Sequence, residues 1–317
     1  MREELEIGLC TRAAAKINLG LFVGPARADG MHELVSVMQS ISLADELTLE
    51  LAPAGSSQDV VVCPGVPGPA AHNLAARALS LFRGATGWDA PALRLSIDKR
   101  IPLAAGLAGG STDAAGTLRL AAHASGLGEH TLLERLAGEL GADVPAALTP
   151  GRWLAGGVGE RLEPLPNPIG SLGLLVLPVA HELSTAAVYA HADSLQTVRS
   201  QRELEDKRRA LVTVLSLGTP APSSDLLTND LQRAAVDLCP EIKKVLRQAA
   251  DSGADEVLLS GSGPTVIGLF LRANPLARVA RAIAGLPERV PEPIAAEAVG
   301  GEFGAVWRRG ASQSIGI

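Results

Sequence analysis

The chain has 317 residues, of which 47% are hydrophobic and 20% are charged, a composition that predicts soluble globular domains with well-buried cores. Its net charge of −6 and pI near 5.6, with no run of Lys or Arg, exclude a nucleic-acid-binding surface. Three cysteines, Cys10, Cys63 and Cys239, are too few and too scattered for a disulfide framework or a zinc site. We expect each of them to be a small buried apolar residue.

The first residues predict no targeting signal. Residues 1–6 read Met-Arg-Glu-Glu-Leu-Glu, which is acidic and lacks the apolar core of a signal peptide. No apolar run approaches the roughly 20 residues that a membrane-spanning helix needs. We therefore expect a cytoplasmic protein that does not contact membranes.

The first half of the chain opens with β structure and continues with strands and helices. Apolar residues alternate up to Val23, which is strand periodicity, and Asp29-Gly30 then predicts a turn. Asn73 is expected to cap one helix and Gly141 to end another. The predicted elements are strands over 7–23, 34–43, 46–51 and 93–97, and helices over 74–83, 111–125 and 131–140.

The second half mixes helices and strands in the manner of an α+β sandwich. We place the domain boundary at the Pro-rich segment before it, so that residues 1–166 form one domain and 167–317 the other. Ser184 is expected to cap a helix that contains Tyr189. The other predicted elements are strands over 172–177, 256–259 and 266–271, helices over 201–210, 229–238, 240–250 and 275–286, and a closing β stretch to residue 307.

A glycine-rich loop runs directly into a helix of small residues that we expect to begin near Ser111. Gly106, Gly109 and Gly110 let a backbone approach a ligand closely, and free N–H groups at a helix start bind anions such as a nucleotide triphosphate. The segment fits neither the P-loop spacing nor the dinucleotide fingerprint. On these residues alone, an ordinary tight strand-to-helix connection remains an alternative.

Five stretches together resemble the GHMP kinase superfamily and span nearly the whole chain in the family's order: Ala14 to Leu19, Arg27 to Leu34, Pro102 to Ala115, Leu140 to Pro145 and Leu259 to Thr265. The resemblance implies a two-domain α+β fold, with an N-terminal ATP-binding domain of mixed sheets and helices and a C-terminal α/β sandwich. Lys16-Ile-Asn18 with Asp29-Gly-Met-His32 resembles the branch of isoprenoid precursor synthesis whose acceptor is a cytidine diphosphate linked to methylerythritol, phosphorylated on its 2-hydroxyl.

The resemblance also implies the parts of a phosphoryl-transfer site. Asp143 matches the family's catalytic aspartate and Lys16 its active-site lysine, with ATP and Mg²⁺ as cofactors. The residues alone favour an N-cap role for Asp143 and an edge or solvent-facing strand charge for Lys16. A hydroxyl of Ser111 or Thr112 is the candidate Mg²⁺ ligand. The expected ATP-binding residues are Pro102, Leu103, Ala104, Ala105, Gly106, Leu107, Ala108, Gly109, Gly110, Ser111 and Thr112.

For the acceptor, Asn18 and His32 match family residues that hold the substrate, and Thr185 and Tyr189 match positions on its cytidine side. From the residues alone, His32 is equally a turn or surface residue, whereas Tyr189 is more often a core residue than a ligand-binding one. Met31 stands where the family usually has a tyrosine, which removes one expected aromatic platform for the base. Other departures are Ala14, Ala104 and Ala105, in place of the family's proline and glycines.

Two other functions compete with this reading. One is a GHMP kinase that acts on homoserine, mevalonate or a sugar, which the Lys16-Ile-Asn18 signature disfavours. The other is a catalytically silent regulator that binds ATP or a metabolite, which an intact Lys16 and Asp143 disfavour. The expected partners are small-molecule substrates, with no nucleic acid and no membrane, and the chain is expected to be a monomer or a homodimer.

Overall fold

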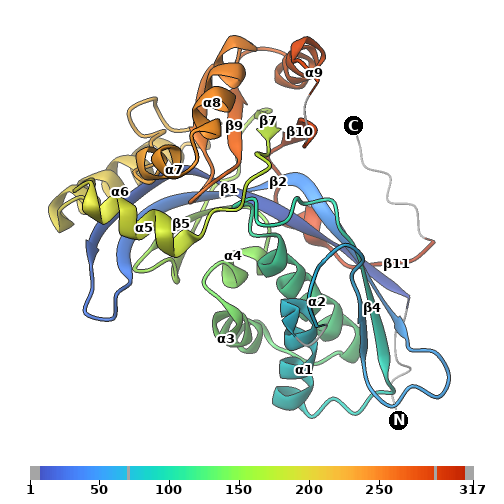
Figure 1. Ribbon diagram of the computed structural model, residues 1–317. Helices are drawn as coiled ribbons and strands as arrows, with labels where there is room; N and C mark the ends of the chain where they lie inside the picture. The colour runs from blue at the N-terminus through green and yellow to red at the C-terminus, as the bar shows by residue number, and fades with distance from the viewer. Residues whose placement is uncertain (1–7, 70–71, 289–290, 311–317) are drawn as a thin grey trace.

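The computed structural model describes residues 8–69, 72–288 and 291–310 (Figure 1). The acidic segment 1–6, for which we expect no signal peptide, lies outside the described residues. Within the described ranges, no helix is both long enough and apolar enough to cross a membrane.

A long antiparallel hairpin of β1 and β2 runs through both halves of the molecule and connects them (Figure 1). The early part of β2 pairs with β5, and its later part pairs with β4. The described residues form a seven-stranded sheet, in the order β11-β1-β2-β4-β3 with β5 on β2 and β6 on β5. Its strands are β1 (Leu9–Ala26), β2 (His32–Leu51), β3 (Val60–Val62), β4 (Leu93–Asp98), β5 (Arg152–Gly156), β6 (Arg161–Leu165) and β11 (Trp307–Arg308).

Four helices pack on the end of this sheet that contains β4 (Figure 1). They bury apolar side chains of β1, β2 and β4 in one core, in which α2 contributes mostly alanines and leucines. Small residues on α2 let it pack closely on the sheet, since a Cβ on Gly116 would lie 3.0 Å from the Leu47 side chain. The helices are α1 (Leu74–Thr86), α2 (Gly109–Ser125), α3 (His130–Leu140) and α4 (Val144–Leu148).

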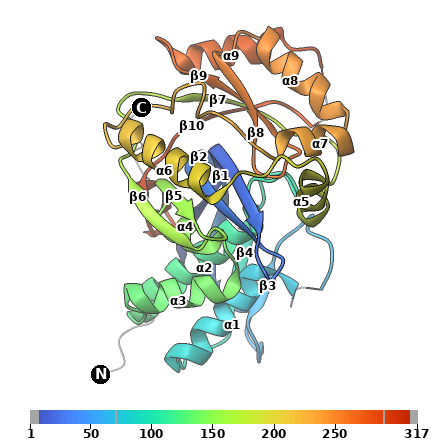
Figure 2. The same cartoon turned by 90° about the vertical axis from the view of Figure 1, so that its left-hand side faces the viewer.

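The second half is built on a four-stranded sheet in the order β10-β7-β9-β8. Both faces of β7 are buried: Leu174 and Val176 pack toward β1 and β2, while Leu175 and Leu177 pack toward the covering helices (Figure 2). The strands are β7 (Gly173–Leu177), β8 (Glu256–Leu259), β9 (Val266–Phe270) and β10 (Ile294–Glu297), and the helices are α5 (Thr185–Ser194), α6 (Gln201–Leu215), α7 (Gln232–Leu238), α8 (Glu241–Asp251), α9 (Pro275–Gly285) and the 3₁₀ helix η2 (Gly301–Gly304).

The predicted strands 34–43 and 46–51 are wrong as separate elements, because β2 is continuous. No turn interrupts it at Asp45, whose side chain is buried and accepts hydrogen bonds from the backbone N–H groups of Arg100 and Ile101. The sequence analysis also missed the β5–β6 hairpin, in which β6 is largely exposed and contains Pro164. The predicted closing β stretch is broken by η2.

Other predictions of local structure are confirmed. Asn73 and Ser184 cap α1 and α5 through their side chains, and Gly141 ends α3. Among the cysteines, Cys10 and Cys239 are buried, whereas Cys63 is only half-buried. The domain boundary stays a prediction. Near its C-terminal end the chain returns to the first sheet, because β11 pairs with β1.

Candidate active site

The glycine loop lies between the end of β4 and the start of α2, with one side in the core and the other toward solvent. Ala105 and Leu107 are buried, whereas Leu103, Ala104 and Gly110 are exposed. The exposed side therefore presents backbone rather than large side chains over most of its length. Such a surface suits a close approach of phosphate groups to backbone amides.

The helix after the loop begins at Gly109, not near Ser111 as expected. Ala108 precedes it with φ +59°, and Ala104 has φ +51°, so both alanines adopt the left-handed region that glycine ordinarily occupies. Such conformations cost of order 1 kcal/mol or more and cluster at functional loops. Gly106, with φ +73°, is the one glycine of the loop that needs this freedom.

A second glycine segment, Ser260 to Gly263, lies directly against the loop. The Ser260 hydroxyl donates to the carbonyl of Gly106 at 3.3 Å, and a Cβ on Gly106 would lie 2.5 Å from the carbonyl oxygen of Gly263. Gly106 is therefore required by this contact as well as by its φ. The Ser260 to Gly263 segment thus lies against the glycine loop, although Gly106 and Ser260 are 154 positions apart in the sequence.

Lys16 lies beside both glycine segments, on β1. Its backbone N–H donates to Leu107 O of the loop at 3.2 Å. The β1–β2 register shifts next to it, since Ala14 pairs with Ala44 whereas Lys16 pairs with Ser40. Irregularities of this kind re-aim side chains and are common next to active sites. Lys16 stays paired with Ser40 of β2, while its backbone N–H holds the loop.

The Lys16 ammonium and the Asp143 carboxylate form a loose ion pair, with Nζ and Oδ1 3.8 Å apart. The Asp143 side chain is 36% exposed, against 15% for Lys16. Asp143 occupies the N-cap position of α4, but its side chain makes no capping hydrogen bond. The capping alternative therefore has no support in the structure, and the carboxylate stays available to a ligand.

Asn18 is held in one orientation by a short chain of hydrogen bonds. The Ser36 hydroxyl donates to Gly20 O at 2.8 Å, so it can only accept from Asn18 Nδ2, which lies 2.7 Å away. This fixes Asn18 Oδ1 toward Lys16 Nζ, at 2.9 Å. The Lys16 ammonium thus has one firm acceptor and one loose carboxylate partner.

The other expected acceptor residues gather around α5. The Tyr189 and His32 rings pack with centroids 5.1 Å apart, and Thr185 Oγ1 lies 2.9 Å from Ser262 Oγ. Burial, and secondly the charge of Asp143, raise the pKa of Tyr189 to about 12. Met31 is 50% exposed and directly precedes β2 at the end of the β1–β2 turn.

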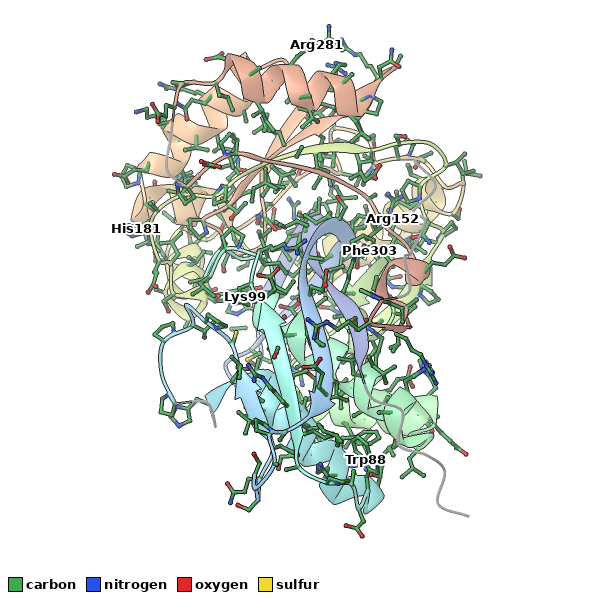
Figure 3. All side chains as sticks on the ribbon, turned by 90° about the vertical axis from the view of Figure 1, so that its right-hand side faces the viewer. Trp88, Lys99, Arg152, His181, Arg281 and Phe303 are labelled. Atoms are coloured by element: carbon green, nitrogen blue, oxygen red, sulfur yellow. The ribbon has the colours of Figure 1, made fainter. Side chains whose placement is uncertain are left out.

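The sequence analysis missed a buried charged cluster on the other side of the glycine loop (Figure 3). Lys99 Nζ donates to Asp113 Oδ2 at 2.8 Å and also to Asp45 Oδ2. Burial raises the pKa of Asp113 to about 7, and Asp45 adds to the rise while Lys99 opposes it. The Lys99 ammonium also lies 3.3 Å from where a Cβ on Gly109 would be. The sequence did contain a signal for this cluster, because Asp45 and Asp113 are charged residues at positions where the patterns of their strand and helix favour apolar residues.

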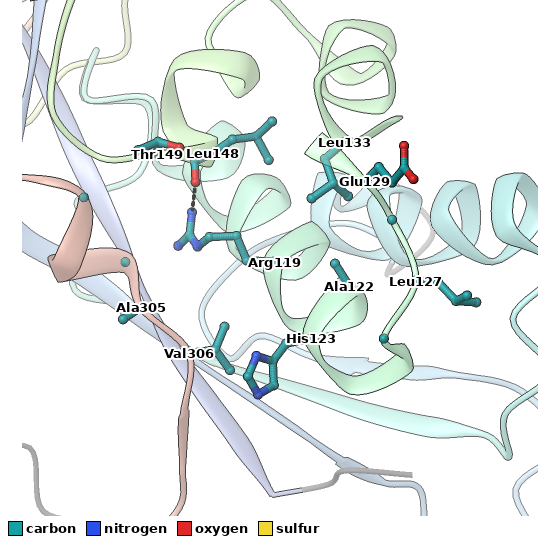
Figure 4. Close-up of a pocket in the computed structure, with 14 residues that line it drawn as sticks. Arg119, Ala122, His123, Leu127, Glu129, Leu133, Leu148, Thr149, Ala305 and Val306 are labelled. Carbon is teal, nitrogen blue, oxygen red and sulfur yellow. Dashed lines mark hydrogen bonds between the residues drawn. The ribbon is translucent and has the colours of Figure 1, made fainter. Parts of the chain in front are cut away.

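A large cavity lies away from all of these residues (Figure 4). It has a volume of about 860 Å³ and is lined by α2, the α2–α3 connection and residues 301–306. Arg119 at its edge donates to carbonyl oxygens of Ala147 and Arg12, and so ties α4 to β1. None of the site residues predicted from sequence lines this cavity.

Comparison with known proteins agrees with the geometry. The model of the GHMP kinases N terminal domain matches residues 73–151, and that of the GHMP kinases C terminal domain matches residues 213–289. The fold alone is shared more widely: a crystal structure of homoserine kinase from Cytophaga hutchinsonii has a TM-score of 0.71 with only 15% identity. Fold and sequence models together define a GHMP kinase.

Relatives with higher sequence identity narrow the class of GHMP kinase to which the chain belongs. The 4-diphosphocytidyl-2-C-methyl-D-erythritol kinase of Corynebacterium glutamicum (strain R) is 43% identical over 82% of this chain and 85% of its own length. That of Gloeobacter violaceus is 38% identical over 87% of this chain and 90% of its own. A crystal structure of 4-(cytidine 5'-diphospho)-2C-methyl-D-erythritol kinase has a TM-score of 0.71 at 34% identity, covering 92% of this chain and all of that one. The chain belongs to the 4-diphosphocytidyl-2-C-methyl-D-erythritol kinase family.

Proposed function

We propose that this protein transfers the γ-phosphoryl group of ATP to the 2-hydroxyl of 4-diphosphocytidyl-2-C-methyl-D-erythritol, in isoprenoid precursor synthesis. The observation that carries the proposal is the Lys16–Asp143 pair, which lies beside the glycine loop and remains open to solvent. Family membership at 43% identity supports this acceptor over homoserine, mevalonate or a sugar. We propose that the enzyme acts in the cytoplasm on small-molecule substrates, as a monomer or homodimer.

Phosphoryl transfer passes through a loose transition state, so positioning and charge stabilisation supply most of the catalysis. In the proposed mechanism the loop from Pro102 to Thr112 holds the triphosphate through backbone N–H groups. Asp143 orients the acceptor hydroxyl and accepts its proton, and the positive charge of Lys16 stabilises the transferring group. Residues 1–166 thus carry the ATP loop and the catalytic pair, and residues 167–317 supply the second glycine segment and α5.

Mg²⁺ is proposed to enter with ATP, and the donors at the loop fit a hard cation that prefers oxygen. The Thr112 hydroxyl is buried and donates to Gly109 O at 2.9 Å, whereas Ser111 is half-buried and its hydroxyl makes no hydrogen bond to the described residues. Ser111 is therefore the better candidate of the two. When bound, Mg²⁺ would neutralise charge on the phosphate oxygens.

On the acceptor side, we propose that Asn18, His32, Thr185 and Tyr189 hold the cytidylyl substrate. The packing of His32 against Tyr189, with ring centroids 5.1 Å apart, supports this proposal, because the two rings together offer an aromatic surface to a base. Met31 directly precedes His32 and is 50% exposed, so its side chain is open to a ligand.

The experiment that tests the proposal is an assay of ADP release over a panel of acceptors. The panel contains 4-diphosphocytidyl-2-C-methyl-D-erythritol, homoserine, mevalonate and a hexose, each with Mg²⁺ and ATP. We expect turnover with the cytidylyl compound alone. Turnover with another acceptor would replace the substrate assignment, and ATP binding without turnover on any of them would favour a silent regulator.

A further inference from the structure

His32 forms a hydrogen bond that the proposed reaction does not use. Its Nε2 atom lies 2.8 Å from Oδ1 of Asp193, in the last turn of α5. Asp193 follows Tyr189 by four residues, so both side chains project from the same face of α5. His32 therefore contacts two residues of one helix, the ring of Tyr189 and the carboxylate of Asp193.

This contact determines which ring nitrogen of a neutral His32 carries the proton. An ionised carboxylate can only accept hydrogen bonds, so Nε2 must be the protonated nitrogen. In a neutral imidazole the other nitrogen, Nδ1, then has a free lone pair. The structure records no hydrogen bond to Nδ1 among the described residues, which leaves this acceptor available to a ligand.

The Asp193 carboxylate has little structural use beyond this contact. Its side chain is 42% exposed, against 7% for His32, and the described residues make no other hydrogen bond or ion pair to it. A purely structural aspartate would be expected to hold several groups, as Asp45 and Asp255 do in this chain. The pair instead combines a nearly buried imidazole with a carboxylate at the surface.

The two pyrimidines of nucleotides differ at the atom that such an acceptor would contact. Cytosine carries an exocyclic N4–H₂ donor, whereas uracil carries an O4 acceptor at the same position, as thymine does. A lone pair on Nδ1 accepts from the amine and repels the carbonyl. A proton on Nδ1 would reverse both interactions.

We propose that Asp193 is a positioning residue that fixes His32 as the Nε2–H tautomer and thereby selects a cytosine over a uracil nucleotide in the acceptor. The inference rests on the proposed function, because it takes the cytidylyl group to lie against His32 and Tyr189. It deepens that function by assigning the base specificity to a residue that does not itself touch the base.

The decisive variant is Asp193→Asn, whose side-chain amide can donate to Nε2 and so move the proton to Nδ1. The matched control is Asp237→Asn, because Asp237 pairs with His191 of the same helix at 3.3 Å. Asp193→Glu restores a carboxylate and should recover part of the wild-type behaviour. Melting temperatures of all three variants verify that they fold, which we expect because both aspartates are exposed.

The first measurement needs no substrate. Two-bond ¹H–¹⁵N correlation spectra at pH about 8, above the range in which histidines are ordinarily protonated, report the tautomer of each imidazole. We expect the Nε2–H form for His32 in the wild type and in Asp237→Asn, and a shift toward Nδ1–H in Asp193→Asn. An unchanged His32 tautomer in Asp193→Asn would overturn the positioning role.

The second measurement compares kcat/KM for the cytidylyl acceptor with kcat/KM for its uridylyl analogue. A matched base contact discriminates by roughly tenfold to a hundredfold, so Asp193→Asn should lower the cytidine-to-uridine preference at least tenfold. The change should lie in the acceptor KM, with kcat and KM for ATP nearly unchanged. An unaltered preference would overturn the specificity role. A wild type that phosphorylates neither compound would instead remove the proposed function, while the spectra would still decide the tautomer.

Discussion

Two clusters of lysine and aspartate contact the glycine loop, and they differ in how fully their charges are satisfied. In the first, Lys16 and Asp143 are 3.8 Å apart, and the carboxylate is 36% exposed. In the second, Lys99 contacts both Asp45 and Asp113, and these carboxylates are 0% and 4% exposed. The same residue types therefore form an open pair whose charges can still bind a ligand and a closed cluster whose charges already bind one another.

The difference follows from where each charge is anchored. Asp45 and Asp113 lie within a central strand and an interior turn of α2, so they must be paired to be buried at all. Asp143 lies at the start of a short helix, where solvent reaches it. Exposure therefore separates the two clusters: Asp113 Oδ1 also has no hydrogen-bond partner but is buried, whereas the Asp143 carboxylate is open to a ligand.

The largest effect should follow from Asp143→Asn, which removes the open carboxylate. We expect kcat to fall about 10³-fold, within the range for loss of a positioned acid–base group. The free energy of unfolding should change by less than about 0.5 kcal/mol, because Asp143 makes no capping hydrogen bond. Steady-state kinetics and urea denaturation measure the two quantities.

Asp89→Asn is the control for that variant, because Asp89 is an exposed aspartate in the loop after α1. It should match the wild type in both measurements. Near-wild-type activity in Asp143→Asn would remove Asp143 from the chemistry and weaken the contrast between the clusters.

Lys16→Met should have the next largest effect, a fall in kcat of about 10²-fold. Methionine keeps the length of the side chain but loses the charge that Asp143 and Asn18 face. The variant leaves the buried Asn18 Oδ1 without its donor, which costs about 1–3 kcal/mol, so the melting temperature should fall only moderately. A large loss of melting temperature with kcat preserved would make the pair structural.

Asp113→Asn tests the closed cluster and should raise stability at high pH. The cluster has two carboxylates for one ammonium, and burial raises the pKa of Asp113 to about 7 from an ordinary 3.8. A raised carboxyl pKa means that the folded state favours the protonated form. Its contribution to stability is therefore complete below about pH 4 and is lost as the pH rises through 7.

Asparagine is neutral at every pH, so the advantage of Asp113→Asn should grow between pH 4 and 7 and level off above. We expect a gain of about 2 kcal/mol at pH about 8, roughly half of what the pKa shift converts to, because the hydrogen bond from Lys99 is weakened. Urea denaturation at pH about 5 and 8 measures it. The same stability difference at both pH values would contradict the prediction.

The sequence predicted much of the fold because the signals were local. Asn73 and Ser184 as helix caps, and Gly141 as a helix end, each depend on residues within one turn of them. The continuity of β2 through Asp45 depends instead on hydrogen bonds from residues 99–101, which no local pattern contains. Asp45, which lies between the two predicted strands, is instead a buried tertiary contact within one continuous strand.

The site was predictable to a similar degree. Motif resemblance named Lys16 and Asp143, which the structure brings together, but spacing could not show that Asp143 lacks a capping bond. The closed cluster was missed because Asp45, Lys99 and Asp113 belong to separate elements and meet only through packing. Tertiary pairing, unlike capping, leaves only the weak signal of a charge at an apolar position.

The smallest effect is expected at the edge of the open site, from Met31→Tyr. Met31 is 50% exposed at the turn that leads into His32, so a ring there can be accommodated without disturbing a core. Stacking on a nucleic-acid base is worth about 1–3 kcal/mol, but part of that is offset by ordering an exposed side chain. We therefore expect the KM for the cytidylyl acceptor to fall by at most about tenfold, or about 1.4 kcal/mol.

Met31→Leu is the matched control for this variant, since it keeps the apolar bulk without a ring and should leave the acceptor KM near its wild-type value. KM for ATP should not change in either variant, because the glycine loop is separate from the turn. Acceptor titrations with thermal melts measure these effects. If Met31→Tyr is as stable as the wild type but has the same acceptor KM, residue 31 faces away from the base. Tyr189 would then be the aromatic side chain on which the base stacks. A higher acceptor KM would show instead that the added ring obstructs acceptor binding.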